Sequence, residues 1–323
     1  MSSVPTDNQI YPSQPGANAD ATSVAPAGPM LPPEYAIPER APTLGEAQRF
    51  CARLANSHYE NFSVVTWFLP KNLRQHFYNV YAYCRISDDL GDEVGDKQQS
   101  LILLDQWEAE LERCYSGEPR HPVFVALRET VRKFEIPKHE FSDLLQAFRQ
   151  DQIVTRYPRF ADLLAYCQNS ANPVGHLVLY LCGYHDAERQ RLSDYTCTAL
   201  QLANFWQDVG VDYGKGRIYL PLEDFAKFGF SERDLAQRRA TPQFLAMMEF
   251  EVERARDWFQ RGLPLIKQVD RRLALDIELF SRGGLAILDA IERQGFDVLK
   301  SRPAISNRRK IWLVARAVMG NLL

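Results

Sequence analysis

The sequence is organised around the stretch Gln201-Leu202-Ala203-Asn204-Phe205-Trp206-Gln207-Asp208-Val209-Gly210-Val211-Asp212. Asn204, Asp208 and Asp212 recur every four residues, so on an α-helix their side chains share one face and can bind a single metal ion. Gln201, one turn earlier, points the same way. Because the neighbouring residues are apolar, we expect this helix to be mostly buried, and a polar stripe on it then needs a function. A stripe that simply faces solvent is the alternative.

A second acidic cluster lies far upstream, in Asp88-Asp89-Leu90-Gly91-Asp92-Glu93. Asp88 and Asp92 share a helix face, which continues backwards through Arg85 and Tyr81. Paired carboxylates are costly to bury without a cation. Mg²⁺ takes one or two carboxylates together with phosphate oxygens, which suits such a half-site. Two clusters facing each other across a helical cavity predict a diphosphate site, whereas this cluster alone could be a solvated helix end.

The segment Gly214-Lys215-Gly216-Arg217-Ile218-Tyr219-Leu220-Pro221 directly follows the first cluster. Its glycines and proline predict a loop that ends the helix. Lys215 and Arg217 have the charge and the donor geometry to bind diphosphate oxygens. Ordinary surface charge is the alternative for both residues.

Composition excludes several classes of protein. With 323 residues and 46% apolar residues the chain can bury a sizeable core, and a net charge of −3 argues against nucleic-acid binding. The six cysteines show no C-x-x-C pair and no zinc spacing, so we expect reduced, mostly buried thiols in a cytoplasmic protein. There is no secretory signal and no apolar run long enough to span a membrane.

The periodicity predicts an all-α protein with one domain. Residues 1–42 hold nine of the 19 prolines and are predicted to be a disordered or extended arm, with a folded domain over 43–323. Thr43 and Glu46 predict a capping box at the first helix, and Pro173 should kink a helix after Asn172. Helices are expected at about 43–57, 70–90, 98–115, 121–134, 138–149, 160–183, 189–212, 242–262, 271–296 and 306–321, with a further helix start at Ser231.

Four passages resemble the squalene and phytoene synthase family, in that family's order and spacing. They are His58-Tyr59-Glu60-Asn61-Phe62-Ser63-Val64, Tyr81 through Glu93, Tyr166-Cys167-Gln168-Asn169-Ser170-Ala171-Asn172-Pro173-Val174-Gly175, and Gln201 through Pro221. The resemblance covers about residues 44–321. It implies the single-domain, all-α isoprenoid synthase fold with a central active-site cavity.

Within that family, the motifs are most similar to those of the hydroxysqualene synthase branch of the bacterial hopanoid pathway. The resemblance rests on the motifs E-N-F-x-V, S-A-N-P-V-G and N-F-W-Q-D-V. Asn172-Pro173 replace a small-residue V-A-G of the general family, and Gln207 stands where an arginine is common. These departures favour the hydroxysqualene branch over an ordinary squalene or phytoene synthase.

The resemblance also assigns roles to residues. Asp88, Asp92, Asn204, Asp208 and Asp212 would bind two or three Mg²⁺ ions and the substrate diphosphate, and the four aspartates would serve catalysis. Tyr166 would lie near the reacting carbons, where it steers a proton or stabilises a cation; a buried core tyrosine is its alternative. The substrate-binding residues would be His58, Phe62, Tyr81, Arg85, Gln201, Asn204, Lys215 and Arg217. Aromatic rings such as Phe62, Tyr81, Tyr166 and Phe205 could face a carbocation without attacking it.

The implied reaction is loss of diphosphate from presqualene diphosphate, rearrangement, and capture of the thirty-carbon cation by water. We expect no NADPH requirement. A sister enzyme that condenses two farnesyl diphosphates to presqualene diphosphate, squalene or phytoene is the nearest alternative. A non-catalytic scaffold that binds a prenyl chain is a more distant one, since a scaffold has no need of five aligned metal ligands.

The product would be an oily alcohol, so we expect contact with the membrane surface and with other enzymes of squalene or hopanoid biosynthesis. The basic C-terminal helix is a candidate for that contact, through Arg308, Arg309, Lys310, Trp312 and Arg316. Packing against the domain with a solvated face is its alternative.

Overall fold

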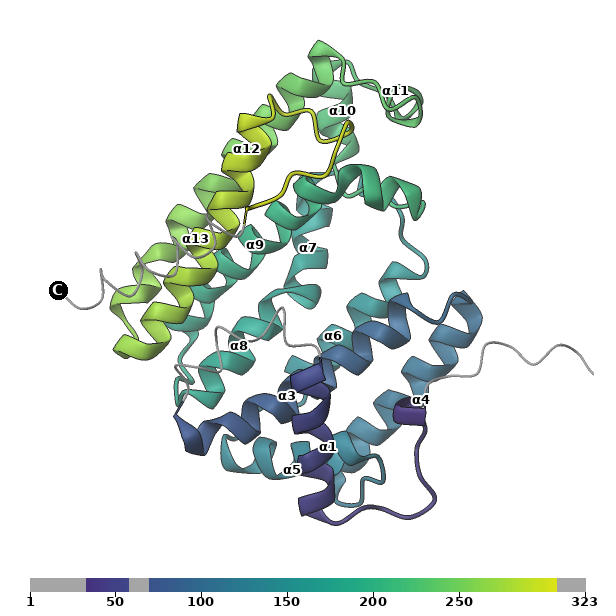
Figure 1. Cartoon of the computed structure of the whole chain (residues 1–323), viewed down its shortest axis with the longest axis vertical. Helices are drawn as coiled ribbons and strands as arrows, with labels where there is room; N and C mark the ends of the chain where they lie inside the picture. The colour runs from purple at the N-terminus through teal and green to yellow at the C-terminus, as the bar shows by residue number, and fades with distance from the viewer. Residues whose placement is uncertain (1–32, 58–69, 307–323) are drawn as a thin grey trace, which may run out of the picture.

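The computed structural model describes residues 33–57 and 70–306, and in this part of the chain every regular element is helical (Figure 1). The α-helices are α1 (Leu44–Ser57), α3 (Lys71–Asp92), α4 (Lys97–Ser116), α5 (Pro122–Lys133), α6 (His139–Asp151), α7 (Phe160–Ser170), α8 (Asn172–Leu181), α9 (Ala187–Gly214), α10 (Leu222–Phe228), α11 (Glu232–Ala236), α12 (Pro242–Gly262) and α13 (Arg271–Arg293), with 3-10 turns at Pro33–Tyr35 and Leu263–Lys267. The predicted all-α class is confirmed.

Helix starts follow the predicted capping residues. Glu46 accepts a 2.8 Å hydrogen bond from the Thr43 backbone N–H, which is half of the predicted capping box. Ser231 accepts a hydrogen bond from the backbone N–H of Asp234 at the start of α11. Thr241 caps α12 in the same way, with Pro242 in its first turn.

The prediction of one kinked helix over 160–183 is wrong in its detail. Two helices, α7 and α8, meet at Ala171, whose backbone leaves the helical region. Pro173 lies in the first turn of α8, where its missing N–H costs no helical hydrogen bond. The proline therefore starts a helix here and does not kink one. The short helix α10, which begins directly after Pro221, was not predicted.

Part of the predicted arm is folded against the bundle. Of residues 1–42, the structure describes 33–42. Tyr35 packs against the core and donates a 2.8 Å hydrogen bond to the buried Asp89 of α3. The Glu34 carbonyl lies 2.9 Å from His121 Nε2. Order among the described residues thus starts before Thr43, while the domain boundary itself stays a prediction.

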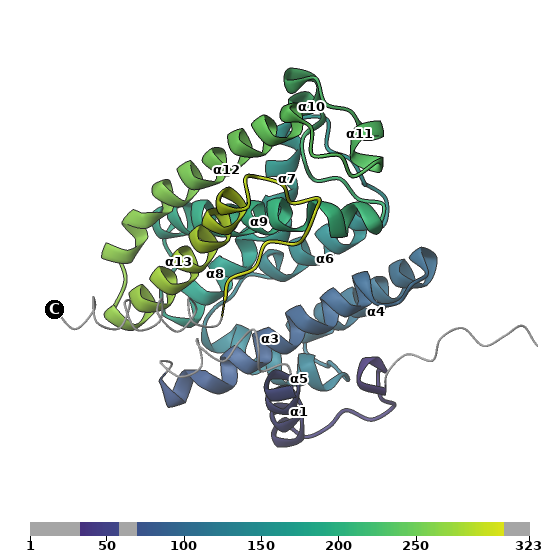
Figure 2. The same ribbon diagram turned by 45° about the horizontal axis from the view of Figure 1, so that its top comes forward.

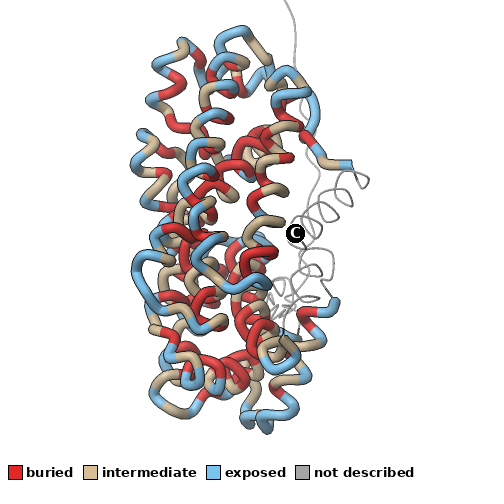
Figure 3. Tube along the Cα trace, turned by 90° about the vertical axis from the view of Figure 1, so that its left-hand side faces the viewer, coloured by how far each residue is buried: buried red, intermediate tan, exposed pale blue. Residues whose placement is uncertain are grey.

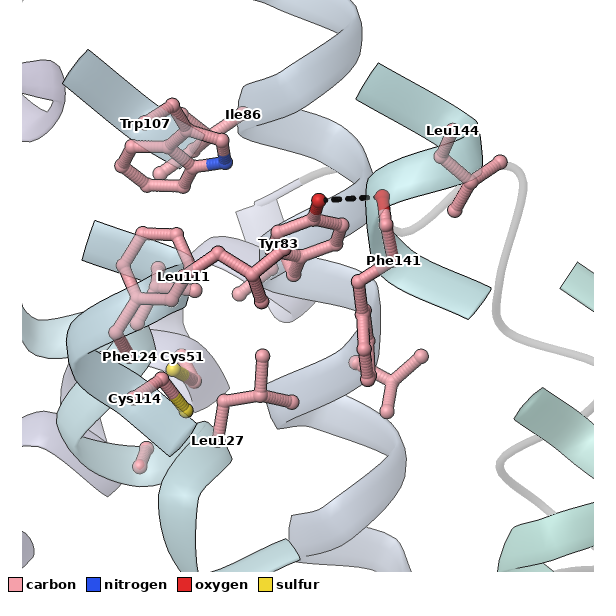
Figure 4. Packing of buried hydrophobic residues seen from close by; sticks show 14 of the residues in the cluster. Cys51, Tyr83, Ile86, Trp107, Leu111, Cys114, Phe124, Leu127, Phe141 and Leu144 are labelled. Atoms are coloured by element: carbon pink, nitrogen blue, oxygen red, sulfur yellow. Dashed lines mark hydrogen bonds between the residues drawn. The ribbon is translucent and has the colours of Figure 1, made fainter. Parts of the chain in front are cut away.

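The N-terminal helices α1 and α3 to α6 share one hydrophobic core. Figure 4 shows its centre, where Tyr83, Trp107, Phe124 and Phe141 pack together. The Tyr83 hydroxyl donates a 2.8 Å hydrogen bond to the Phe141 carbonyl. The buried polar groups of these aromatic residues are thereby satisfied, which keeps α3 and α6 in one register.

The C-terminal helices build a second core around α9, the longest helix, which packs on α12 and α13 (Figures 1 and 2). Trp206 at its centre is fully buried and donates a 3.0 Å hydrogen bond to the Glu251 carbonyl of α12. α8 joins the two cores. Its Leu177 belongs to the first, while Gly175 lets it approach α9 so closely that a β-carbon there would lie 2.2 Å from Ser193 Oγ.

This two-core arrangement positions the acidic clusters. α3 carries Asp88 and Asp92 and belongs to the first core, and α9 carries Asp208 and Asp212 and belongs to the second. Exposed residues gather on outer helix faces and connections, with buried residues between the helices (Figure 3). No helix among the described residues is long and apolar enough to cross a membrane.

Candidate active site

The first cluster lies at the C-terminal end of α3. About half of the Asp88 side chain is exposed (51%). Desolvation by the surrounding protein, and then the charge of the neighbouring Asp92, nevertheless raise the pKa of Asp88 to about 6. Arg85 contacts Asp88 at 3.7 Å and binds the buried Asp89 through two nitrogens. Asp89 also accepts the hydrogen bond from Tyr35. Asp89 therefore fixes Arg85, whereas the side chains of Asp88 and Asp92 are partly exposed.

The second cluster lies near the C-terminal end of α9. Burial, and then the charge of Asp208, raise the pKa of Asp212 to about 7. Asp208 is bound by both Nε and Nη2 of Arg302, which follows α13. Asn204 is exposed on the same face, and Gln201 is half-buried one turn before it. The predicted stripe exists, and an arginine from the C-terminal segment covers part of it.

The loop after α9 connects the two clusters. Arg217 Nη2 donates a 3.0 Å hydrogen bond to Asp92 Oδ1, and Lys215 Nζ lies 3.7 Å from Asp92 Oδ2. The loop is held in place by an isolated bridge between Ile218 and Arg156. Gly216 adopts φ +81°, which favours glycine. Both basic residues predicted for the diphosphate site therefore face the acidic end of α3.

Tyr166 lies behind this loop in a buried aromatic group. Its hydroxyl donates a 2.8 Å hydrogen bond to Asp151, and Tyr219 donates to the same carboxyl at 3.4 Å. Phe205 stacks on Tyr219 with ring centroids 3.9 Å apart. Burial raises the pKa of Asp151 to about 6, against the effect of the Tyr166 hydrogen bond and of Arg217. Tyr166 is thus buried with its hydroxyl oriented by a carboxyl, and its role near the reacting carbons stays a prediction.

The donor atoms fit Mg²⁺. Asp88, Asp92, Asp208 and Asp212 offer carboxylate oxygens and Asn204 an amide oxygen, the hard donors that this ion prefers. Within the described ranges, no three His, Cys, Asp or Glu side chains are gathered to hold a metal by themselves. A site that supplies one or two carboxylates per ion matches Mg²⁺ bound jointly with diphosphate oxygens, and does not match a closed protein cage.

An apolar cavity of about 200 Å³ lies beside the earlier turns of the same helices. Phe77 of α3, Val174 and Val178 of α8, and Leu200 of α9 line it, together with the start of α13. Leu200 lies four residues before Asn204 and shares its helix face, so the polar stripe of α9 continues into an apolar wall. The predicted cavity is present next to the predicted polar site.

The structure places most, though not all, of the predicted residues. Tyr81, Arg85, Asp88 and Asp92 lie on one helix, and Gln201, Asn204, Asp208 and Asp212 on another. His58 and Phe62 lie outside the described residues, as does the C-terminal helix predicted for membrane contact. Sequence reasoning missed Asp89, Asp151 and Arg302. Asp89 was visible within the quoted cluster, whereas Asp151 and Arg302 carry no local signal because they reach the site from distant segments.

The two departures from the general family pattern have structural roles. Gln207 Nε2 donates a 2.6 Å hydrogen bond to the Pro303 carbonyl, and its Oε1 accepts one from Arg302. Gln207 thereby holds the segment that delivers Arg302 to Asp208. Asn172 Oδ1 accepts a 3.0 Å hydrogen bond from Thr198, which ties the start of α8 to α9.

Comparison with known proteins identifies the family of the chain. A family model described as squalene/phytoene synthase matches residues 55–309. The 15-cis-phytoene synthase of Synechococcus elongatus is 32% identical, over 87% of this chain and 95% of its own. The phytoene synthase of Arthrospira platensis is 30% identical, over 83% and 91% of the two chains.

Solved structures agree with the sequence comparison. The crystal structure of squalene synthase HpnC from Alicyclobacillus acidocaldarius is similar with a TM-score of 0.75 and 47% identity, over 78% of this chain and 95% of that chain. A dehydrosqualene synthase in complex with a ligand is similar with a TM-score of 0.77 and 26% identity, over 86% and 97% of the two chains. The chain therefore belongs to the squalene/phytoene synthase family.

Proposed function

We propose that this protein is a Mg²⁺-dependent hydroxysqualene synthase. It converts presqualene diphosphate and water to hydroxysqualene and diphosphate, without NADPH. Members of its family are head-to-head synthases that bind prenyl diphosphates. The observation that carries the proposal is the pairing of two acidic helix ends, from α3 and α9, across a basic loop and beside an apolar cavity.

The polar end would bind the diphosphate. Asp88, Asp92, Asn204, Asp208 and Asp212 would hold Mg²⁺, which, when bound, neutralises the leaving group and lowers the barrier to ionisation. Arg217 and Lys215 already face this end, and their donors can turn from Asp92 to diphosphate oxygens. Arg302 can do the same from Asp208. Each of these positively charged side chains then stabilises the negative charge that develops on the diphosphate as the carbon–oxygen bond breaks.

The apolar end would shelter the hydrocarbon. Phe77, Val178 and Leu200 carry no nucleophile, so a carbocation held against this part of the wall is not trapped by the protein, although Ser193, Thr196, Cys197 and Asp276 line other parts of it. Tyr166 is kept protonated because burial, and then the charge of Asp151, raise its pKa well above its usual value. Its oxygen is fixed by Asp151, and its ring packs with Phe205 in the buried aromatic group. Water then supplies the hydroxyl oxygen, and its proton leaves with the diphosphate.

The choice of branch rests on similarity and on residues of this chain. Identity to the squalene synthase HpnC is 47%, against 32% to the cyanobacterial phytoene synthase. Gln207 anchors the Arg302 segment through neutral hydrogen bonds, where many relatives are expected to place another positive charge. An uncharged residue at position 207 favours an enzyme that ionises one diphosphate over an enzyme that binds two diphosphates.

A condensing synthase is the second candidate. Several curated relatives are named phytoene synthases, and the same carboxylates could bind the diphosphates of two prenyl substrates. Contact with a membrane surface and with other enzymes of squalene or hopanoid biosynthesis stays a prediction.

Incubation of the purified protein with Mg²⁺ and one of two substrates tests the proposal. Presqualene diphosphate and farnesyl diphosphate are supplied separately, each with and without NADPH, and products are identified by mass spectrometry. We expect hydroxysqualene from presqualene diphosphate regardless of NADPH. Asp208→Ala is the inactive control. Turnover of farnesyl diphosphate alone would instead establish the condensing synthase.

A further inference from the structure

The apolar cavity contains a carboxyl group that the proposed reaction does not use. Asp276, in the second turn of α13, lines the cavity and is 4% exposed. Its Oδ1 is buried and finds no hydrogen-bond partner among the described residues. Buried polar atoms are nearly always paired, and an unpaired carboxyl oxygen is costly. Asp276 therefore places a carboxyl group with an unpaired oxygen in the wall of the cavity.

Two hydroxyl residues of α9 also belong to the cavity wall. Ser193 and Thr196 line the cavity, and the Thr196 hydroxyl is also buried without a partner in the described part of the chain. The other lining residues are almost all apolar, among them Leu265, Leu273 and Ile277. Few polar side chains therefore interrupt a hydrocarbon-lined space, and Ser193 and Thr196 lie at the N-terminal end of its α9 wall.

That end is remote from the acidic clusters. Along the axis of α9, Thr196 precedes Asn204 by about 12 Å and Asp208 by about 18 Å. Phe77 precedes Asp88 on α3 by about 16 Å. The charge of Asp276 also acts on the Cys182 thiol, at the far end of α8. A prenyl chain with its diphosphate between α3 and α9 would thus point its tail towards Asp276.

The carboxyl is adapted to being neutral. Burial, and then the charge of Asp270, raise the pKa of Asp276 to about 7. In its protonated form the group both donates and accepts a hydrogen bond. A cavity of about 200 Å³ has ample room for a water molecule beside it.

We propose that Asp276 forms a polar cap at the tail end of the prenyl cavity and is a specificity-determining residue for chain length. The cap holds a water molecule, with Thr196 as a neighbouring polar group. A fifteen-carbon chain ends before it, whereas a twenty-carbon chain must displace the water and leave the carboxyl unpaired. The inference rests on the proposed function only in assigning the cavity to a prenyl chain.

The test measures binding and needs no turnover. Wild type with Mg²⁺ is titrated with three unreactive S-thiolodiphosphates, carrying a farnesyl, an ω-hydroxyfarnesyl or a geranylgeranyl chain. We expect at least ten-fold tighter binding of farnesyl than of geranylgeranyl. The ω-hydroxyl should be tolerated without loss, because it can replace the water on Asp276.

Asp276→Leu and Asp276→Asn form the matched pair. Leucine removes the polar cap with little change in volume, so the preference for farnesyl over geranylgeranyl should fall about ten-fold and ω-hydroxyfarnesyl should bind about ten-fold more weakly than farnesyl. Asparagine keeps a polar group and should retain both preferences. Thr196→Val should change both binding preferences in the same direction as Asp276→Leu, by a smaller factor of about three.

The outcomes separate the two proposals. If wild type binds farnesyl and geranylgeranyl equally, or Asp276→Leu keeps the wild-type ratios, the polar cap is contradicted while the prenyl site stands. If Asp276→Leu fails to fold, the three wild-type affinities and the Thr196→Val variant still test the polar cap. If wild type binds none of the three analogues, the assignment of the cavity to a prenyl chain is contradicted and the chain-length role with it, whereas turnover of presqualene diphosphate tests the proposed function separately.

Discussion

Arg217, on the loop after α9, donates a 3.0 Å hydrogen bond to Asp92 at the end of α3. This contact joins the end of α3, a helix of the first core, to the loop that follows α9, a helix of the second core. Arg217 has only 16% of its side chain exposed, and its charge also acts on the buried Asp151. One guanidinium therefore links the carboxylates of α3 that we propose as metal ligands to the aromatic group around Tyr166.

Replacing Arg217 should weaken catalysis more than folding. Arg217→Ala removes a charge that would receive the departing diphosphate, so kcat/KM should fall by about 100-fold. Arg217→Lys keeps the charge without the planar donor pair and should lose about ten-fold. Steady-state kinetics on presqualene diphosphate measures both. Arg233→Ala, on the exposed part of α11, is the control and should leave the rate unchanged.

Asp151 should act through Tyr166. Asp151→Asn leaves the substrate pocket intact and disturbs the carboxyl that fixes the Tyr166 hydroxyl, so kcat should fall about ten-fold while KM changes little. Tyr166→Phe should lower kcat by at least as much. Since both changes affect one hydrogen bond, the double variant should be no slower than Tyr166→Phe alone. Fully multiplicative losses would show that Asp151 works independently of Tyr166.

His176 should make folding stability depend on pH. Its ring lies between Glu140 of α6, at 3.0 Å, and Asp194 of α9, at 2.7 Å. Burial disfavours the charged ring, but the hydrogen bonds to Asp194 and Glu140 outweigh it and raise the pKa of His176 to about 9. Nearby charged groups are His139, Glu140 and Asp143 on α6 and Arg191 and Asp194 on α9.

The sign of that dependence follows from the raised pKa. The stabilisation is fully present below about pH 6.5, the pKa of an unfolded histidine, and is lost as the pH rises through 9. The free energy of unfolding should therefore fall by about 2 kcal/mol over this window, allowing for screening at the partly exposed Asp194. Urea denaturation at a series of pH values measures it. His176→Gln should flatten the curve, and an unchanged slope in that variant would assign the effect to other groups.

Tyr35 should contribute to stability although it belongs to the proline-rich N-terminal region. Tyr35→Phe removes the hydrogen bond to Asp89 and should lower the free energy of unfolding by about 1 kcal/mol. Because Asp89 also binds Arg85, a modest loss of diphosphate affinity is expected as well. Chemical denaturation and titration with diphosphate and Mg²⁺ measure the two effects. No change in either would mean that the Tyr35 contact is not maintained in solution.

Local patterns predicted much of the fold and the first layer of the site. The four-residue spacing of Asn204, Asp208 and Asp212 placed them on one helix face because the helical period requires it. Thr43 and Ser231 marked helix starts because a side-chain acceptor has to pair the free N–H groups there. Pro173 was misread, since a proline kinks a helix or starts one depending on where the previous helix ends.

The sequence alone does not predict which distant residues form hydrogen bonds with the site residues. Arg302 binds Asp208 across 94 residues of chain, and Tyr35 binds Asp89 across 54. No periodicity connects such positions, because the packing of whole helices brings them together. The same holds for Asp276, whose place in a cavity wall is set by α8, α9 and α13 jointly. An isolated aspartate in the sequence of α13 resembles any solvated helix residue.

The central claim is the capture of a thirty-carbon cation by water. Its most direct test is a reaction of the purified protein with presqualene diphosphate and Mg²⁺ in ¹⁸O-labelled water, without NADPH. The account predicts hydroxysqualene that carries the label in its hydroxyl group, and no such product from Asp208→Ala. Squalene formed only when NADPH is added, or no conversion of presqualene diphosphate by a protein that condenses farnesyl diphosphate, would contradict it.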